Sequence, residues 1–200
     1  MKTARALATL GLGTLATMAA VVSPAVAQDT KPTRATTAQH CVIDTDTNSK
    51  SCFSSYRAAI SAATKGRVTD APDDSRAAAH DKKLQERLSG PRSEHGAKSV
   101  QNARSAAAAE SRVLATIYSD KDFGGNSLNL TGTQGCQRYS WFANLYDGWN
   151  DSISSTSSGQ CDITLFQHSN FLGFSQTYRG AVPYVGDAMN DQASSISFDR

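Results

Sequence analysis

The hydrophobic pattern sets the first stretch of the chain apart from everything that follows. After the basic residues Lys2 and Arg5, an uncharged apolar run extends from Leu7 to Val22 and ends near the small residues Ala25-Val26-Ala27. This order is typical of a cleaved secretory signal. A membrane anchor is the alternative, but the run is short for a transmembrane helix and ends at a cleavage site. Residues 1–27 therefore predict a signal peptide and a secreted, extracellular protein.

Residues 28–69 predict a small N-terminal unit. Its first part, 28–40, is polar and Thr-rich without periodicity, as in a flexible terminus. Two short segments, 41–43 and 51–53, each contain a cysteine, flank a polar turn and predict a disulfide-closed hairpin. The apolar residues that follow recur on one face of a helix, namely Phe53, Tyr56, Ile60 and Ala63. We interpret this unit as a structural cap, with binding to a partner as the alternative.

Residues 70–113 have the composition of a linker. They are rich in Ala, Ser and charged residues, and they contain few large apolar side chains. The segments Asp81–Leu88 and Ala103–Leu114 consist largely of good helix formers, and Gly90-Pro91 separates them. We therefore expect a linker that is partly helical and otherwise disordered.

The C-terminal part, residues 114–200, repeats itself. Residues 116–125 match 164–173 at a constant offset of 48, and both contain an aromatic, four further residues, a second aromatic, one residue and a glycine. The pattern Asn-Asp-x-x-Ser-Ser occurs at 150–155 and again at 190–195, at an offset of 40. The first copy therefore holds eight extra residues. Two related segments in the same order make a chance match improbable.

Each repeated pattern has a physical interpretation. The first predicts a tight hairpin whose two rings cover the turn, while the glycine permits a backbone angle that a side chain would forbid. The second places amide, carboxylate and hydroxyl oxygens within six residues. These hard donors suit calcium better than zinc or copper. The alternative is a pair of polar turns that hold the strands without a metal. Trp149 and Met189, which precede the two copies, are expected in the core.

Together these elements resemble the βγ-crystallin family, in its secreted bacterial, calcium-binding branch. Its Greek-key motif opens with the aromatic pattern and carries the Asn-Asp-x-x-Ser-Ser signature. The aromatic pattern is filled twice, by Tyr118, Phe123 and Gly125 and by Phe166, Phe171 and Gly173. The resemblance implies an all-β fold, with two Greek-key motifs forming a βγ-crystallin sandwich over 114–200. The small disulfide-closed unit and the partly helical linker would precede it.

The resemblance also implies two Ca²⁺ sites, each shared between the motifs. In each site one motif supplies a hydroxyl from the fifth position of the signature and a backbone carbonyl from the third. The other motif supplies an amide or carboxylate from its first two positions, and carbonyls near Lys121 and Ser169 would complete the sites. The first set is Ser154, Ser152 and Asn190 or Asp191; the second is Ser194, Gln192 and Asn150 or Asp151.

The number of cysteines is consistent with a secreted protein. There are four, and an even number in a secreted chain favours disulfides. Of three pairings we favour Cys41–Cys52 and Cys136–Cys161, because each pair lies within one segment. The spacing of cysteines and histidines does not indicate a zinc site.

Calcium binding by a non-enzymatic extracellular domain is the function we expect, because no residues resemble a nucleophile and its base. The first motif's insertion, 136–146, is aromatic enough to be an interface. If Cys136 is bridged, it ties this insertion to the start of the second motif, a feature that resembles secreted bacterial metalloproteinase inhibitors with a crystallin-type fold. The rings of the insertion are Tyr139, Trp141, Phe142 and Tyr146. Inhibition of a secreted metalloproteinase is therefore an alternative, although core packing of these rings is favoured. A cell-wall-acting or toxin-like module is a third possibility.

Charge and hydropathy limit the other partners. The formal net charge is +2, which gives no electrostatic reason to expect a nucleic acid. No stretch beyond the signal is long and apolar enough to cross a bilayer. We expect a soluble monomer after cleavage.

Overall fold

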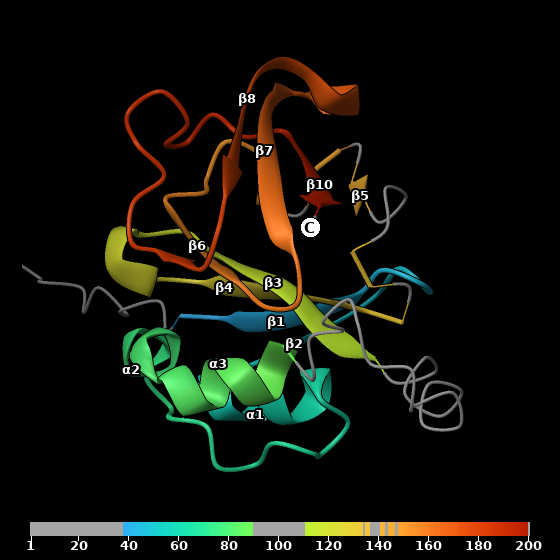
Figure 1. Ribbon diagram of the computed structural model, residues 1–200, viewed down its shortest axis with the longest axis vertical. Helices are drawn as coiled ribbons and strands as arrows, with labels where there is room; N and C mark the ends of the chain where they lie inside the picture. The colour runs from blue at the N-terminus through green and yellow to red at the C-terminus, as the bar shows by residue number, and fades with distance from the viewer. Residues whose placement is uncertain are drawn as a thin grey trace, which may run out of the picture. The chain divides into compact units, whose positions relative to one another are not determined.

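Two β-sheets face each other in the computed structural model, which describes residues 38–89, 111–133, 135–136, 141–142, 144–146 and 148–199. The signal peptide and residues 103–110 of the predicted second linker helix lie outside these residues. Sheet A has the strand order β2-β1-β4-β3-β6-β9, and sheet B has the order β5-β10-β7-β8 (Figure 1). The strands of sheet A are β1 His40–Asp44, β2 Ser49–Phe53, β3 Arg112–Tyr118, β4 Ser127–Gly132, β6 Ser155–Ser158 and β9 Ala181–Val182. Those of sheet B are β5 Trp141–Phe142, β7 Asp162–His168, β8 Leu172–Tyr178 and β10 Ser195–Asp199.

The strands form two interlocked motifs. β3 to β6 form the first motif and β7 to β10 the second. In each motif the fourth strand returns beside the first, since β6 pairs with β3 and β10 with β7. The third strand of each crosses to the other sheet, where β5 pairs with β10 and β9 with β6. Such a return beside the first strand is a Greek-key connection. The fold class predicted from the sequence is confirmed.

The main core lies between the two sheets. Aliphatic residues of the strands and of the loop before β6 form it, and the best-buried ones are Leu114, Ile117, Leu130, Ile153, Ile163, Leu165 and Ile196. Trp149 and Met189 are buried beside them, as predicted, with 6% and 0% of their surfaces exposed. The disulfide between Cys136 and Cys161 ties the insertion of the first motif to the start of the second. This pairing and the Cys41–Cys52 pairing confirm the predicted disulfides.

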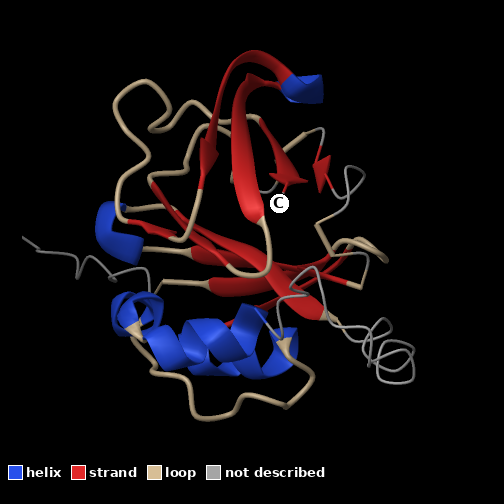
Figure 2. Ribbon diagram, viewed as in Figure 1, coloured by secondary structure: helices blue, strands red, loops and turns tan. Residues whose placement is uncertain are grey.

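The N-terminal segment extends sheet A and covers its outer face. β1 pairs in parallel with β4, from His40 opposite Ser127 to Asp44 opposite Thr131. The predicted hairpin is present as β1 and β2, and the predicted helix as α1 Tyr56–Ala63. Two more helices follow, α2 Ser75–His80 and α3 Lys82–Ser89. All three lie on the face of sheet A that points away from sheet B (Figure 2).

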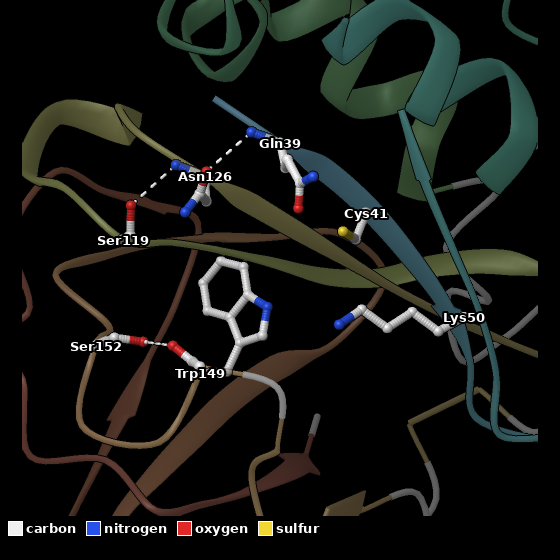
Figure 3. A pocket seen from close by; sticks show the side chains of 8 residues that line it. Gln39, Cys41, Lys50, Ser119, Asn126, Trp149 and Ser152 are labelled. Carbon is white, nitrogen blue, oxygen red and sulfur yellow. Dashed lines mark hydrogen bonds between the residues drawn. The ribbon is translucent and has the colours of Figure 1, made fainter. Parts of the chain in front are cut away.

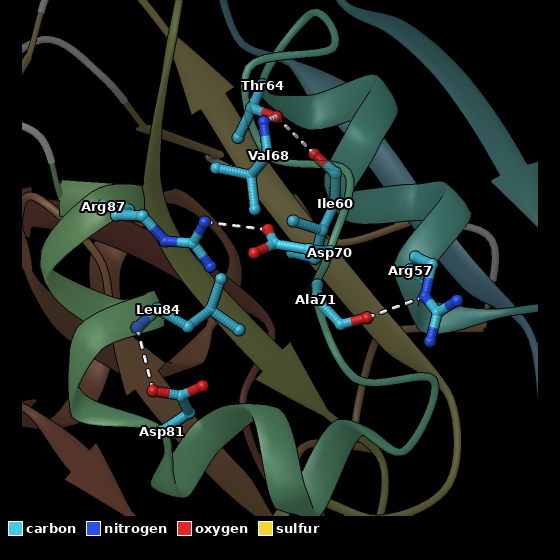
Figure 4. Close-up of polar contacts among 9 residues, drawn as sticks. All are labelled: Arg57, Ile60, Thr64, Val68, Asp70, Ala71, Asp81, Leu84 and Arg87. Atoms are coloured by element: carbon cyan, nitrogen blue, oxygen red, sulfur yellow. Dashed lines mark hydrogen bonds and ion pairs between the residues drawn. The ribbon is translucent and has the colours of Figure 1, made fainter.

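Much of the predicted linker is thus ordered on the sheet. Leu84 and Leu88 of α3 are 0% and 2% exposed, in a second core that includes Tyr118 and Phe123. Polar contacts brace this helical layer, residues 56–89, from within (Figure 4). Arg57 Nε donates to the Ala71 carbonyl at 2.8 Å.

An ion pair and a helix cap complete that bracing. Arg87 binds Asp70 at 2.8 Å and thereby lowers the pKa of that carboxyl. Asp81 Oδ1 accepts a hydrogen bond from Leu84 N at 3.1 Å, at the start of α3. Exposed ion pairs contribute little to stability, so the buried leucines hold the layer in place.

The helix predicted over Ala103–Leu114 is wrong at its C-terminal end. Residues 112–114 belong to β3, where Arg112 and Val113 pair with β4. Val113 and Leu114 are 1% and 0% exposed, so burial on both faces of the sheet outweighs the helix propensity of this segment. Among the described residues, no helix has the length and apolar character needed to cross a bilayer.

Candidate metal sites

The two aromatic hairpins have the same geometry, as the repeat predicts. The rings of Tyr118 and Phe123 meet edge to face with centroids 5.5 Å apart, and those of Phe166 and Phe171 do so at 5.6 Å. Both second aromatics have a positive φ, of 60° and 62°, and the glycines two residues later have φ values of 67° and 79°. Each hairpin therefore depends on the left-handed conformation that its glycine accepts without strain.

The two signature loops also fold alike, and each reaches the other. Asp151 and Asp191 both have a φ of 54°, a conformation that aspartate tolerates. The Asp151 N–H donates to the Ala193 carbonyl at 3.0 Å, and the Asp191 N–H donates to the Ile153 carbonyl at 3.1 Å. Backbone hydrogen bonds thus join the two signatures, although 40 residues separate them in sequence.

The first residue of each signature orients the carboxylate of the second. Asn150 Nδ2 donates to Asp151 Oδ2 at 2.8 Å, and Asn190 Nδ2 donates to Asp191 Oδ2 at 2.7 Å. With one carboxylate oxygen held in this way, the other oxygen, Oδ1, is presented to the opposite motif.

The fifth-position serines meet these carboxylates in a crossed arrangement. Ser154 Oγ lies 3.5 Å from Asp191 Oδ1, and Ser194 Oγ lies 3.3 Å from Asp151 Oδ1. Each cluster therefore combines a hydroxyl of one motif with a carboxylate of the other. We call the Ser154–Asp191 cluster the first site and the Ser194–Asp151 cluster the second site.

A backbone carbonyl adjoins the second site, and the third-position side chains bind carbonyls close to them in sequence. Ser194 Oγ donates to the Gln167 carbonyl at 2.9 Å, so the hairpin carbonyl that adjoins the second site is that of Gln167, two residues before Ser169. Ser119 occupies the equivalent position of the first hairpin. At the third positions, the Ser152 hydroxyl donates to Gly148 O at 2.7 Å, and the Gln192 amide donates to Asp191 O at 2.9 Å.

The sixth-position serines have a role that was not predicted. Ser155 Oγ donates to the Asp120 carbonyl at 2.6 Å and accepts from the Phe123 N–H at 3.0 Å. In the second motif, Ser195 Oγ makes the same pair of hydrogen bonds, to the His168 carbonyl at 2.6 Å and from the Phe171 N–H at 3.0 Å. Each of these serines fastens its hairpin to its signature. The sequence feature that could have revealed this role is the serine at the sixth position of both signatures.

The donor chemistry fits a calcium ion. Each site offers a hydroxyl and a carboxylate oxygen, and the second site adds the Gln167 carbonyl; all of these are hard ligands. Ser154 and Ser194 are only 5% and 8% exposed, whereas both aspartates reach solvent. In the first site, Asn190 Oδ1 is buried without a hydrogen-bond partner, a costly condition that a cation would relieve. Within the described ranges, His, Cys, Asp and Glu form no group of three that could hold a metal by themselves.

The first site has charged neighbours. Lys121 Nζ lies 3.8 Å from the centroid of the Tyr184 ring. The Tyr184 hydroxyl donates to Asp187, and this hydrogen bond, together with the charge of Asp191, raises the pKa of Tyr184. Tyr184 therefore contacts both Lys121 and Asp187, and it feels the charge of Asp191, a residue of the first site.

A small cavity of about 130 Å³ lies where the N-terminal hairpin meets the first motif (Figure 3). Gln39 N donates to Asn126 Oδ1 at 2.8 Å at its upper edge, and Asn126 N donates to Ser119 Oγ at 2.9 Å. Lys50 and Trp149 line the cavity below these contacts. The N-terminal segment thus touches the same hairpin that adjoins the first site.

Comparisons with known proteins find similarity in solved structures only. No protein-family model and no curated protein matches the chain. The chain is similar to a βγ-crystallin domain from Clostridium beijerinckii, at 25% identity over 43% of this chain and 97% of that one, with a TM-score of 0.36. A βγ-crystallin domain from Flavobacterium johnsoniae matches at 27% identity, over 42% and 92% of the two chains, with a TM-score of 0.35. A βγ-crystallin from Ciona intestinalis matches at 23% identity, over 42% and 98%, with a TM-score of 0.35.

Proposed function

We propose that the protein is a secreted, non-enzymatic calcium-binding protein whose two Ca²⁺ ions stabilise its crystallin-type domain. The crossed pairing of Ser154 with Asp191 and of Ser194 with Asp151 supports this proposal most directly. Each pair brings together a neutral and an anionic oxygen from different motifs, and the Gln167 carbonyl lies beside the second pair. Secretion is inferred from the N-terminal signal.

Calcium at these positions would join the two motifs. An ion held by Ser154 Oγ, the Ser152 carbonyl and the Asp191 carboxylate has ligands from both signatures, and it requires both motifs to be folded. A ligand that binds only the native state raises the free energy of unfolding, by about 2.7 kcal/mol per site at a hundredfold excess over Kd. Affinity should be modest, because each site has one carboxylate among neutral donors.

The test is a calcium titration of the mature chain by calorimetry and thermal unfolding. We expect about two ions per chain and a calcium-dependent rise in Tm. Ser154→Arg and Ser194→Arg should each remove one site, because a cation replaces a neutral donor. The matched control is Ser175→Arg, the same substitution at an exposed position of β8. A chain that takes up no calcium, or a Ser154→Arg variant that retains both sites, would refute the proposal.

Inhibition of a secreted metalloproteinase is the second candidate function. The observation that favours it is the exposure of Tyr146, which is 66% accessible in the insertion that the Cys136–Cys161 disulfide closes. An exposed aromatic on an anchored segment is a suitable interface residue. Assay of the mature protein against a thermolysin-type protease tests it. Inhibition that is lost in Tyr146→Ala but retained in Ser154→Arg would support this function, and no inhibition at micromolar protein would exclude it.

A further inference from the structure

The two equivalent hairpins differ in what covers them. Phe123 of the first hairpin is 0% exposed beneath the helical layer. In the second hairpin, Leu172 is 61% exposed, and Phe174 of the following strand is 49% exposed. The repeat thus provides two hairpins of the same geometry, one clamped and one open to solvent.

Helix α2 makes the clamp through the backbone of the first hairpin. Ser75 Oγ donates to the Phe123 carbonyl at 2.6 Å, and Arg76 Nε donates to the Asp122 carbonyl at 3.2 Å. The His80 ring packs edge to face on the Phe123 ring at 5.2 Å between centroids. These contacts hold consecutive residues that both have left-handed backbone angles, with φ of 53° and 60°.

A glycine makes this close approach possible. A Cβ added at Gly124 would lie 2.5 Å from Arg76 Nη2, so a side chain at this position would displace the guanidinium. The equivalent residue of the second hairpin is Leu172, which has a large side chain and is exposed. The two hairpins therefore differ at position 124, where Arg76 can approach the backbone only because glycine has no side chain.

The clamped hairpin is joined directly to the first site. Ser155 binds Phe123 N and Asp120 O, and the adjacent Ser154 N–H donates to the Tyr118 carbonyl at 3.0 Å. Phe123 is consequently held at both backbone groups, by Ser75 at its carbonyl and by Ser155 at its N–H. The conformation of residues 118–123 sets where Ser154 and the Ser119 carbonyl lie.

We propose that Ser75 and Arg76 are positioning residues for the first calcium site, which they preorganise so that it binds Ca²⁺ more tightly than the second. This inference rests on the proposed function. A hairpin that is already fixed loses less conformational freedom when its carbonyl binds an ion, so less of the binding free energy is spent on ordering. Because coupling is reciprocal, calcium at the first site also strengthens the docking of α2.

The experiment isolates each site in the full mature chain. Ser194→Arg leaves the first site alone, and Ser154→Arg leaves the second. Ser75→Ala and Arg76→Ala are introduced into each background, and calcium affinity is measured by calorimetry. We expect the first site to lose affinity by about five- to twentyfold, the lower range of typical coupling, while the second site is unchanged. Ser75→Thr, which keeps the hydroxyl, should restore most of the affinity.

The control variant is Arg87→Ala, which removes an exposed ion pair of the same helical layer away from the hairpin. It should leave both affinities unchanged. Hydrogen exchange in residues 75–80 should slow on calcium addition only when the first site is intact, a readout that general destabilisation does not reproduce. If Arg76→Ala does not fold, Ser75→Ala carries the test.

Three results would overturn the inference. One is an unchanged affinity of the first site in both Ser75→Ala and Arg76→Ala, and another is an equal loss at both sites. In these cases calcium still binds and the proposed function survives. A parent chain that binds no calcium would refute the proposed function and this inference together.

Discussion

The first and second motifs of this protein share their local geometry but not their surroundings. Their aromatic pairs differ by 0.1 Å in ring separation, at 5.5 and 5.6 Å. Yet Tyr118 and Phe123 are both 0% exposed, whereas Phe166 and Phe171 are only partly buried. The same pattern of residues therefore builds the same hairpin twice, and a separate segment of the chain decides which hairpin belongs to a core.

The edge strands show the same contrast. β4 is paired with β1 in sheet A, while the equivalent strand β8 is the edge of sheet B. The polar outward residues of β4 are used in this pairing. Ser127 Oγ lies 2.9 Å from His40 Nδ1, and Asn129 Nδ2 donates to the Cys41 carbonyl at 3.1 Å. The polar residues of β4 alternate as in a solvent-facing strand, but in the first motif they form hydrogen bonds with β1 instead.

The largest expected effect compares the second aromatics of the two hairpins. Phe123→Ala should reduce the free energy of unfolding by about 3–5 kcal/mol, because it empties a fully buried site. Phe171→Ala should cost under about 1.5 kcal/mol, since its ring is already partly exposed and loses less burial. Urea unfolding of both variants measures the difference. Equal losses would mean that the helical layer contributes nothing to the first hairpin.

A smaller effect comes from exchanging the residues that differ between the hairpins. Gly124→Leu should destabilise the protein by about 1–3 kcal/mol, because its side chain would displace Arg76 from the hairpin. Leu172→Ser, at the exposed equivalent position, should change stability by less than about 0.5 kcal/mol. Thermal unfolding of the pair tests this, and a neutral Gly124→Leu would show that the clamp is dispensable for stability.

The smallest expected effect is a pH dependence of stability that arises from His40, whose partner Ser127 belongs to the first motif. Burial lowers the pKa of His40 from its ordinary value of 6.5, so the folded protein favours the neutral imidazole. The unfolded chain then binds more protons just below pH 6.5, and the free energy of unfolding falls as the pH decreases through that value. Denaturant titrations across this range in the parent and in His40→Gln should differ in slope. Parallel curves would show that His40 does not contribute.

The amino-acid sequence by itself determined the parts of this protein that depend on short-range patterns. The aromatic hairpins, helix α1, both disulfides and the buried Trp149 follow from spacings of a few residues or from cysteines within one segment. The signatures also indicated oxygen-rich clusters, because the identity of the side chains fixes the kind of donor that they offer. Calcium itself remains a proposal.

Tertiary structure decided what depends on contacts between distant segments. The parallel pairing of β1 with β4 and the packing of α2 and α3 could not be read from their residues, since Ser127 and Asn129 have the alternation of a solvent-facing strand. Residues 112–114 have helix-forming neighbours but lie in β3. Burial against a remote partner outweighs local propensity in such cases, because each well-packed side chain contributes more free energy than the differences between propensities. For the same reason, the repeat specified two hairpins of the same geometry, and only the packing of the helical layer made one of them buried and left the other exposed.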